Sequence, residues 1–368
     1  MSRVTVADVE RAIARAFPPE WAEEWDRGGL LVGDPEREVT GVMLALDPTM
    51  SAVSAAAEQE CNVLVTHHPV FLKAPEWLTP GRGAAGVVWA AMDAGVALIN
   101  AHTNLDRAPA AGTLLASALG LTPLRPIERA TMPMTLVTVF VPPRAAENVS
   151  KAMIGAGAGR IGEYERCSFT SAEGRGAFTP PAGGQPFAGV PDESSSASEV
   201  RLEMVAPRNR ARGVVAAARG AHPYEEPLIV AADVEIARSS ARMGMLCSAP
   251  EGLTLRSLAE LAEQAFGSTP VVWGDPDAVL KRVATATGSA GSLVSDVFSS
   301  GAQALVAGEV RYHDALDAAE NGLAVMELGH DVSEWPLVSL LEGAVRSTLG
   351  LAAGDVHVLP ALPGWWTP

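Results

Sequence analysis

Short apolar segments alternate with helical segments in both the first and the last third of this chain. In the first third, buried strands are predicted at 39–46, 63–66 and 96–100. After residue 243 the alternation returns, with strands predicted at 283–288, 304–308 and 324–328. Strands that alternate with helices form a largely parallel sheet with helices on both faces. The sequence therefore predicts an α/β fold with two similar lobes that arose by internal duplication.

The segment between residues 129 and 240 has a different character. Its order of strand, helix, strand, strand, helix, strand is that of ferredoxin-like domains. Within it, the polar run DESSSAS at 192–198 is expected to be an exposed loop, because small polar residues bury little surface. We expect three domains: a first α/β lobe at 1–128, an inserted α+β ferredoxin-like module at 129–240, and a second α/β lobe at 241–368.

Charge and cysteine content exclude several classes of protein. With 43 acidic and 27 basic residues, the net charge of −16 would repel a phosphate backbone, which argues against nucleic acid as the main partner. Cys61, Cys167 and Cys247 are far apart and form no CxxC pair, so neither a disulfide framework nor a thiolate zinc site is expected. These features favour a reducing, cytoplasmic location.

The most apolar stretch, at 84–101, is interrupted by Asp93 and Gly95. It reads as a helix followed by a strand, and no membrane-spanning segment is predicted. The first residues carry charges every few positions and lack the apolar core of a signal peptide, which also favours a cytoplasmic protein.

Histidines and carboxylates gather where three of the apolar runs end. They occur in LVTHHP (64–69, with His67 and His68), INAHTNLD (99–106, with His102 and Asp106) and MELGHDVSE (326–334, with His330 and Glu334). Ligands of open α/β sheets bind at the carboxyl ends of the strands. In the last two segments the histidine precedes the carboxylate by four residues, a spacing that puts both groups on one side of a helical turn.

These residue types indicate a metal site. Imidazole and carboxylate are the ligands that divalent first-row metals use in hydrolytic centres. Five donors exceed what one open tetrahedral ion needs and suit two bridged ions. We therefore predict two divalent cations, chosen among zinc, iron, manganese, cobalt and nickel, in a cleft between the lobes. The predicted ligands are His67, His68, Asp106, His330 and Glu334.

Two further histidines are candidates for catalytic roles. His102 can bind the metal itself, or it can contact Asp106 and orient it without binding the metal, and we prefer the second role. His313, in GEVRYHDA, follows a predicted strand and is a candidate proton shuttle or substrate contact, although a histidine at a helix start can also have no chemical role. His357 is read as a structural residue. No serine or cysteine nucleophile motif is present.

Seven motifs in order along the chain resemble the Nif-three-like dinuclear metal centre proteins, often named GTP cyclohydrolase 1 type 2 homologues. They are EWDRGGLLVGD (24–34), LVTHHP, INAHTNLD, GAGAGRIGEYERCSF (155–169), AHPYEEP (221–227), GEVRYHDA (308–315) and ELGHDVSEWP (327–336). The resemblance implies two α/β lobes around a di-metal site, a toroidal homohexamer, and ligands at the five positions named above. One departure lies at 110–113, where many relatives have a glycine and an asparagine or aspartate.

Two functions follow as expectations. The first is a cytosolic, metal-dependent hydrolase that acts on a nucleotide-like substrate, with GTP ring opening as the candidate that the family label implies. The alternative is a metal-handling (chaperone or storage) or regulatory scaffold without turnover, whose inserted module senses a small molecule or docks a partner. A purely structural site is disfavoured, because such sites are usually closed by four ligands at one ion.

Overall fold

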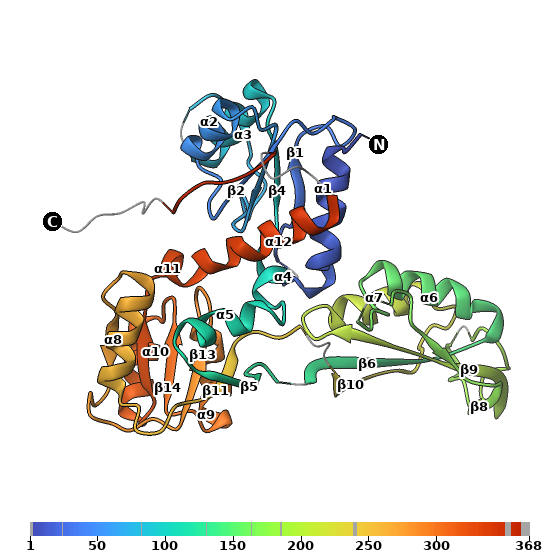
Figure 1. Ribbon diagram of the computed structural model, residues 1–368. Coiled ribbons are helices and arrows are strands. Elements are labelled where there is room, and N and C mark those ends of the chain that lie inside the picture. The colour runs from blue at the N-terminus through green and yellow to red at the C-terminus, as the bar shows by residue number, and fades with distance from the viewer. Residues whose placement is uncertain are drawn as a thin grey trace. The chain divides into compact units, whose positions relative to one another are not determined.

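The computed structural model describes residues 3–23, 25–81, 83–129, 131–162, 164–184, 186–237, 241–349 and 355–361. The chain divides into two compact units, each described here by itself. The first comprises Met1–Arg129 and Ser240–Pro368, and the second comprises Ala130–Ser239. Helices and strands occur in both units (Figure 1), so the predicted mixed α/β class is confirmed.

The first unit contains a sheet whose described strands lie in the order β1-β4-β3-β2-β16. Their bounds are Gly29–Val32 (β1), Val42–Ala45 (β2), Val63–Thr66 (β3), Ala97–Asn100 (β4) and Val356–Val358 (β16). β16, β2, β3 and β4 pair in parallel, and β1 pairs antiparallel with β4. The carboxyl ends of β2, β3 and β4 therefore lie at one edge of the sheet, as the sequence pattern predicts.

Helices cover both faces of this sheet. They are α1 (Val6–Ala16) and α12 (Val338–Leu349) on one face, and α2 (Met50–Glu58) and α3 (Gly83–Ala94) on the other. Side chains alternate between the faces along β3: Val63 and Val65 are buried with α1 and α12, whereas Leu64 is buried with α2 and α3. Burial on both faces explains why these strands are short continuous apolar runs.

A second sheet of the same unit has its described strands in the order β12-β15-β14-β13-β11-β5. Their bounds are Thr122–Pro126 (β5), Met245–Ser248 (β11), Val271–Trp273 (β12), Arg282–Thr285 (β13), Ala304–Ala307 (β14) and Ala324–Glu327 (β15). β13, β14 and β15 are parallel, and the other three pair antiparallel with their neighbours. The carboxyl ends of the three parallel strands again share one edge.

This second sheet is also covered on both faces. Helices α5 (Ala111–Ala118) and α8 (Leu255–Phe266) pack on one face, and α9 (Val294–Ser300) and α10 (Tyr312–Glu320) pack on the other. Successive residues of β14 separate in the same way: Val306 is buried with the first pair of helices and Leu305 with the second. Two short helices, α4 (Thr103–Asp106) and α11 (His330–Glu334), follow β4 and β15.

The end of the chain returns to the first sheet. A helix is expected at 334–348, but the structure has α11, a 3-10 turn at Trp335–Leu337 and then α12. The turn contains Pro336, whose missing N–H and ring disfavour a continuous α-helix. Helix α12 (drawn in red in Figure 1) contacts α1, and β16 extends the first sheet beside β2. The core of the first sheet thus includes Val338, Leu341, Val345 and Val356, which follow the second sheet in the sequence.

The second unit is an antiparallel sheet with its described strands in the order β10-β6-β9-β7, and β8 also pairs with β9. The bounds are Thr131–Val141 (β6), Phe169–Thr170 (β7), Gly174–Phe178 (β8), Ser195–Pro207 (β9) and Ile229–Ala237 (β10). Helices α6 (Ala146–Gly155) and α7 (Ala211–Ala221) cover one face, where Met153 and Val214 are buried with Leu202 of β9.

The expected exposed loop at 192–198 is partly wrong. Strand β9 begins at Ser195, and its first residues pair with β8 from Phe178 to Gly174. Their side chains bury little, as their composition predicts, but the backbone satisfies its hydrogen bonds by pairing with β8. Among the described helices of the whole chain, none is long and apolar enough to cross a membrane.

Candidate metal centre

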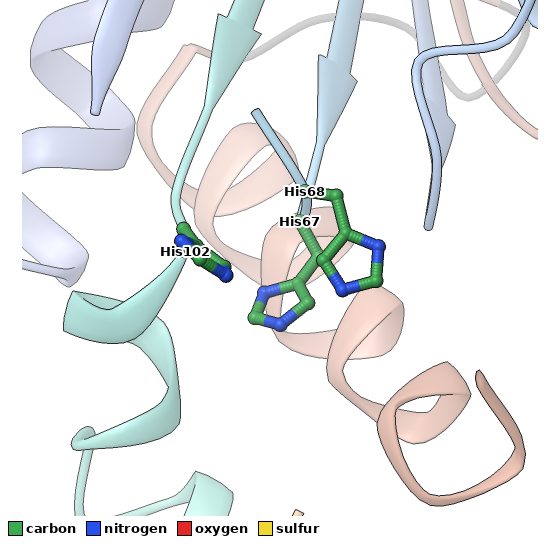
Figure 2. A group of neighbouring side chains, drawn as sticks. All are labelled: His67, His68 and His102. Carbon is green, nitrogen blue, oxygen red and sulfur yellow. The ribbon is translucent and has the colours of Figure 1, made fainter. Parts of the chain in front are cut away.

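The polar edge of the first sheet supplies three of the predicted residues. β3 ends at Thr66, so His67 and His68 come directly after the strand, and His102 follows the end of β4 by two residues. Because the strand has ended, neighbouring side chains are not forced to opposite faces, and the rings of His67 and His68 lie side by side with centroids 4.9 Å apart. Figure 2 shows these two rings and that of His102 directed toward the same space.

The turns after β4 and β15 supply the remaining donors. Asp106 is the last residue of α4, and His330 and Glu334 are the first and last residues of α11. Both spacings of four residues therefore span one helical turn, as predicted. Asp106 and Glu334 are buried.

Glu334 is the residue that joins the donors. Its Oε1 lies 3.6 Å from His67 Nε2, and its Oε2 lies 2.9 Å from His68 Nε2 and 3.1 Å from His330 Nε2. Asp106 Oδ1 lies 3.7 Å from the same Nε2 of His67. Three groups have donor atoms within 4.8 Å of one another: His67, His68 and His102; His68, His330 and Glu334; and His67, Asp106 and Glu334. The five predicted ligands and His102 are thus brought together.

The imidazoles and carboxylates shift one another's proton affinity. Burial alone would lower the pKa of His67, but the carboxylates of Asp106 and Glu334 raise it. Against the same burial, the hydrogen bond to Asp47 and the negative charge of Glu334 raise the pKa of His68 to about 10. The carboxylate of Glu334 raises the pKa of His330 to about 9.

The two carboxylates respond in opposite directions. Burial raises the pKa of Asp106. Burial would also raise the pKa of Glu334, but the three imidazoles around it lower the pKa well below its ordinary value. The site therefore holds one carboxylate that is strongly stabilised as an anion and one that is poorly compensated without an added positive charge.

The donor set fits a metal cation. His67 Nδ1 lies 3.0 Å from the carbonyl oxygen of Ala101, and since a carbonyl only accepts, Nδ1 carries the proton and the lone pair of neutral His67 is on Nε2. That buried Nε2 faces two carboxylates and has no hydrogen-bond partner among the described residues. The buried Oε2 of Glu334 also lacks one, despite its short distances to two imidazole nitrogens. Electron pairs converging on one space are what a cation satisfies.

Three carboxylates behind the imidazoles were not predicted from the sequence. His68 Nδ1 donates to Asp47 Oδ1 (2.7 Å), and His102 Nδ1 donates to Asp26 Oδ1 (2.8 Å). His330 Nδ1 lies 3.1 Å from Glu309 Oε1. Each contact directs the Nε2 atom of its ring into the site, the arrangement that metal-binding histidines commonly show.

Sequence signals for these residues exist only in part. Asp47 follows the apolar run that forms β2, so the rule of polar residues at strand ends could have found it. Glu309 follows β14 in the same way. Asp26 lies in an irregular segment and is held by Thr103, whose N–H and hydroxyl both donate to it, so no periodic pattern marks it. With His102, Thr103 lowers the pKa of Asp26 to about 2, against the effect of burial.

The loop after β13 packs against both carboxylates. The hydroxyl of Thr287 donates to Asp106 Oδ1 at 3.0 Å. At the next position, a Cβ on Gly288 would come within 2.1 Å of Glu334 Oε1, and φ is +56°. Only glycine therefore allows the Glu334 carboxylate to reach its observed position without displacement.

The two candidate catalytic histidines lie in different surroundings. The ring of His102 belongs to the donor cluster, and its Nδ1 is bound to Asp26. His313 is exposed on the first turn of α10 and its ring contacts that of Tyr312, with centroids 5.3 Å apart. His313 is in none of the three donor groups found among the described residues.

Comparison with known proteins finds a matching family model and similar sequences over most of the chain. A family model described as Duf34/NIF3 (NGG1p interacting factor 3) matches residues 4–359. A Mycobacterium tuberculosis protein named GTP cyclohydrolase 1 type 2 homolog is 33% identical over 358 residues, which cover 94% of this chain and 93% of that protein. A Bacillus subtilis protein of the same name is 33% identical over 316 residues, 85% of this chain and 84% of that protein.

A solved structure is similar over the full length. The crystal structure of a Bacillus cereus protein related to NIF3 has a TM-score of 0.66 and 28% sequence identity, and the match covers 100% of both chains.

Proposed function

This chain belongs to the Duf34/NIF3 family, and from that membership and its buried donor cluster we propose that it is a dinuclear metal-dependent hydrolase acting on a nucleotide-like substrate. The observation that carries the proposal is the convergence of unpaired lone pairs on one space, from His67 Nε2 and Glu334 Oε2 above all. The names of the relatives, GTP cyclohydrolase 1 type 2 homolog, suggest GTP as the first substrate to try.

We propose that two divalent cations are held by His67, His68, Asp106, His330 and Glu334. Glu334 has one oxygen toward His67 and the other toward His68 and His330, which suits a bridging role. When bound, such ions would act as Lewis acids on a substrate oxygen and lower the pKa of water.

The proposed role of the other residues is to orient and to move protons. Asp26 accepts a hydrogen bond from Nδ1–H of His102, which keeps the proton on Nδ1 and leaves a lone pair on Nε2 directed into the site, as a general base requires. His313 is exposed, which allows it to exchange protons with solvent, and we propose it as a proton shuttle or substrate contact.

Metal analysis followed by a turnover assay tests this proposal. We expect the purified full-length chain to retain two divalent ions and to hydrolyse at least one member of a panel of GTP, other nucleoside triphosphates, phosphodiesters and cyclic amides. His68→Ala should lose both metal and turnover. Glu320→Gln changes an exposed residue at the end of α10 and should leave both unchanged. Bound metal without turnover of any panel member would overturn the hydrolase proposal and leave metal binding standing.

A metal-handling or regulatory role is the second candidate. It is favoured by the exposure of His330, whose side chain is 39% accessible and gives solvent a route to the donors. If this role is correct, bound metal should pass rapidly to an apo-acceptor, and turnover should be absent. Metal that is retained against the acceptor and supports a substrate-dependent rate would exclude it.

We also propose the finer architecture. In both sheets of the first unit, three adjacent parallel strands have an antiparallel strand beside the last of them, β1 beside β4 and β12 beside β15, which supports an internal duplication and a cleft between two lobes. The antiparallel sheet with α6 and α7 on one face supports a ferredoxin-like inserted module. The domain bounds 1–128, 129–240 and 241–368 stay a proposal, with α12 and β16 packing on the first sheet.

The assembly and location are proposals that rest on the resemblance and the composition. We propose a homohexamer, and light scattering of the purified chain tests it: a mass near six times 38.2 kDa is expected, and a monomer would contradict it. We propose a cytoplasmic location from the cysteine usage, and fractionation of cells that express the chain tests it.

A further inference from the structure

The second unit contains a pocket of about 840 Å³ that the proposed hydrolase chemistry does not use. All the residues that line it belong to this unit. Its walls come from β8, the segment after β8, the middle of β9, and the segment at 224–228 after α7. Its volume lies within the range of pockets that hold small molecules.

Aromatic rings form much of the wall. Phe178, Phe187 and Tyr224 line the pocket, and the rings of Phe187 and Tyr224 are 5.6 Å apart between centroids. The guanidinium of Arg144 lies 4.5 Å from the centroid of Phe187. A planar cation therefore already stacks on one of these rings, which shows that the electron-rich faces here accept positive charge.

The pocket also contains a carboxylate without a cation. Glu199 is half-buried and forms no ion pair with any described residue, while the neighbouring Arg201 is paired with Glu203 at 3.3 Å. The carboxylate of Glu199 lies over Gly176 of β8, where a Cβ would come within 2.4 Å of Oε2. Because glycine has no Cβ, Gly176 leaves room for the Glu199 carboxylate.

The negative charge of Glu199 affects the pKa of Tyr224 in the pocket wall. Burial, and after it the Glu199 carboxylate, raises the pKa of the Tyr224 phenol to about 12. The Tyr224 hydroxyl is shielded from solvent and has no hydrogen-bond partner among the described residues. A ligand with an N–H donor can bind the carboxylate, and the same ligand can stack on the rings.

We propose that this pocket binds a flat aromatic ligand bearing a cationic N–H donor group, of the aryl amidine class. The ring lies among Phe178, Phe187 and Tyr224, and the cation pairs with Glu199. An anionic ligand of the same shape is disfavoured, because the pocket is lined by three carboxylates (Glu199, Glu225 and Glu226) against two guanidinium groups (Arg175 and Arg201).

Benzamidine is the probe, tested by titration calorimetry and saturation-transfer NMR on the full-length chain. Benzoate has the same shape and opposite charge, and cyclohexanecarboxamidine has the same charge without the aromatic ring. We expect benzamidine to bind at least about tenfold tighter than either comparison compound, the effect of losing one charged hydrogen bond or ring stack. Metal removal should not change these values, since no predicted metal ligand lines the pocket.

Variants locate the binding. Glu199→Gln keeps the shape of the side chain and should weaken benzamidine by about tenfold or more, while strengthening benzoate, because the repelling negative charge is removed. Glu193→Gln alters an exposed carboxylate nearby in sequence that does not line the pocket, and should have no effect. Ala188→Trp places a large side chain at a part-buried residue that lines the pocket and should abolish binding of all three compounds.

Three results would overturn the proposal: no saturable benzamidine binding up to about 10 mM, equal affinity for benzamidine and benzoate, or full binding in Ala188→Trp. If Ala188→Trp is unfolded, Glu199→Gln still decides whether the carboxylate contributes. These outcomes are independent of metal content and turnover, so the pocket and the metal centre can fail separately.

Discussion

Two pairs of residues with the same spacing face the candidate metal centre from the ends of different sheets. His102 and Asp106 follow β4, and His330 and Glu334 follow β15. In both pairs one helical turn separates the histidine from the carboxylate. The carboxylates differ in their contacts: Asp106 accepts a hydrogen bond from Thr287, whereas Glu334 is surrounded by three imidazoles.

The histidines of the two pairs differ in what holds them. His102 is bound to Asp26, whose side chain is fully buried, and His102 itself is 14% exposed. His330 lies beside Glu309, and their side chains are 39% and 55% exposed. Equal sequence spacing therefore produces one rigidly supported pair and one that solvent reaches. The sequence spacing thus determines the direction in which the two side chains point. Burial of the supporting carboxylate determines how firmly the histidine is held.

Removing the charge of Glu334 should have the largest effect. In Glu334→Gln the side chain keeps its size but can no longer balance the three imidazoles. We expect metal affinity to fall by more than about 100-fold, since altering even a group behind a ligand costs about 10- to 100-fold. Competition with a chromogenic chelator measures the affinity. Asp106→Asn is the corresponding change in the other helical turn. It should lower metal affinity by less than Glu334→Gln does, because fewer imidazoles contact Asp106.

The control for this comparison is Glu320→Gln, an exposed carboxylate at the end of α10. It should bind metal as the unmodified chain does. An Asp106→Asn variant that loses more affinity than Glu334→Gln would contradict the central role assigned to Glu334.

The supporting carboxylates provide the next test. Asp26→Asn should lower metal affinity by about 10- to 100-fold, because a buried carboxylate that fixes a histidine ring is replaced by a weaker acceptor. Glu309→Gln should change affinity by less than about tenfold, because an exposed ion pair contributes at most about 1 kcal/mol. The same chelator competition applies to both. Equal losses of metal affinity in the two variants would mean that burial of the supporting carboxylate does not determine how firmly the histidine is held.

A smaller effect is expected at Thr287. Thr287→Val removes the hydroxyl that donates to Asp106 and keeps the shape of the side chain. A single hydrogen bond of this kind is worth about 1 kcal/mol, so metal affinity should fall by less than about tenfold. Thr285→Val removes a hydroxyl that has no hydrogen-bond partner among the described residues, and is the matched control. Equal affinity in Thr287→Val and the unmodified chain would show that Asp106 does not depend on this bond.

Much of the candidate centre could be predicted because its candidate ligands follow strands that carry strong signals. The apolar runs that become β3, β4 and β15 are short and bounded by polar residues, so their ends mark where His67, His102 and His330 lie. The convergence of these ends on one space is a property of the whole fold. No local pattern indicates that Glu334 meets His67, more than 260 residues away in the chain.

The features that were not predicted depend on tertiary contacts, which produce no periodic pattern in the sequence. Asp26 is defined by its hydrogen bonds to Thr103 and His102 and not by its place in a strand or helix. The short strand β16 joins the first sheet only because α12 carries the chain back to it. At Ser195, small polar side chains that bury little surface predicted a loop, but the backbone pairs with β8 and forms a strand.

His222 extends the comparison to a histidine without a carboxylate support. Its Nε2 lies 2.9 Å from the carbonyl oxygen of Phe140, and its Nδ1 accepts from the N–H of Tyr224. The carbonyl requires the proton on Nε2, so a second proton on Nδ1 would displace the Tyr224 bond. Burial, moreover, lowers the pKa of His222 from its ordinary value of 6.5, whereas the pKa values of His67, His68 and His330 are raised.

The smallest predicted effect follows from that opposite direction. In the unfolded chain His222 takes up a proton near pH 6.5, but in the folded chain it stays neutral to lower pH. Its contribution to stability is therefore complete above pH 6.5 and is lost as the pH falls through 6.5 toward the folded pKa. Urea-dependent proteolysis, with cleavage mapped to residues 130–239, should show this loss between about pH 7.5 and pH 5. In His222→Gln, which keeps a donor for Phe140, the loss should shrink; an unchanged pH dependence would assign it to other groups.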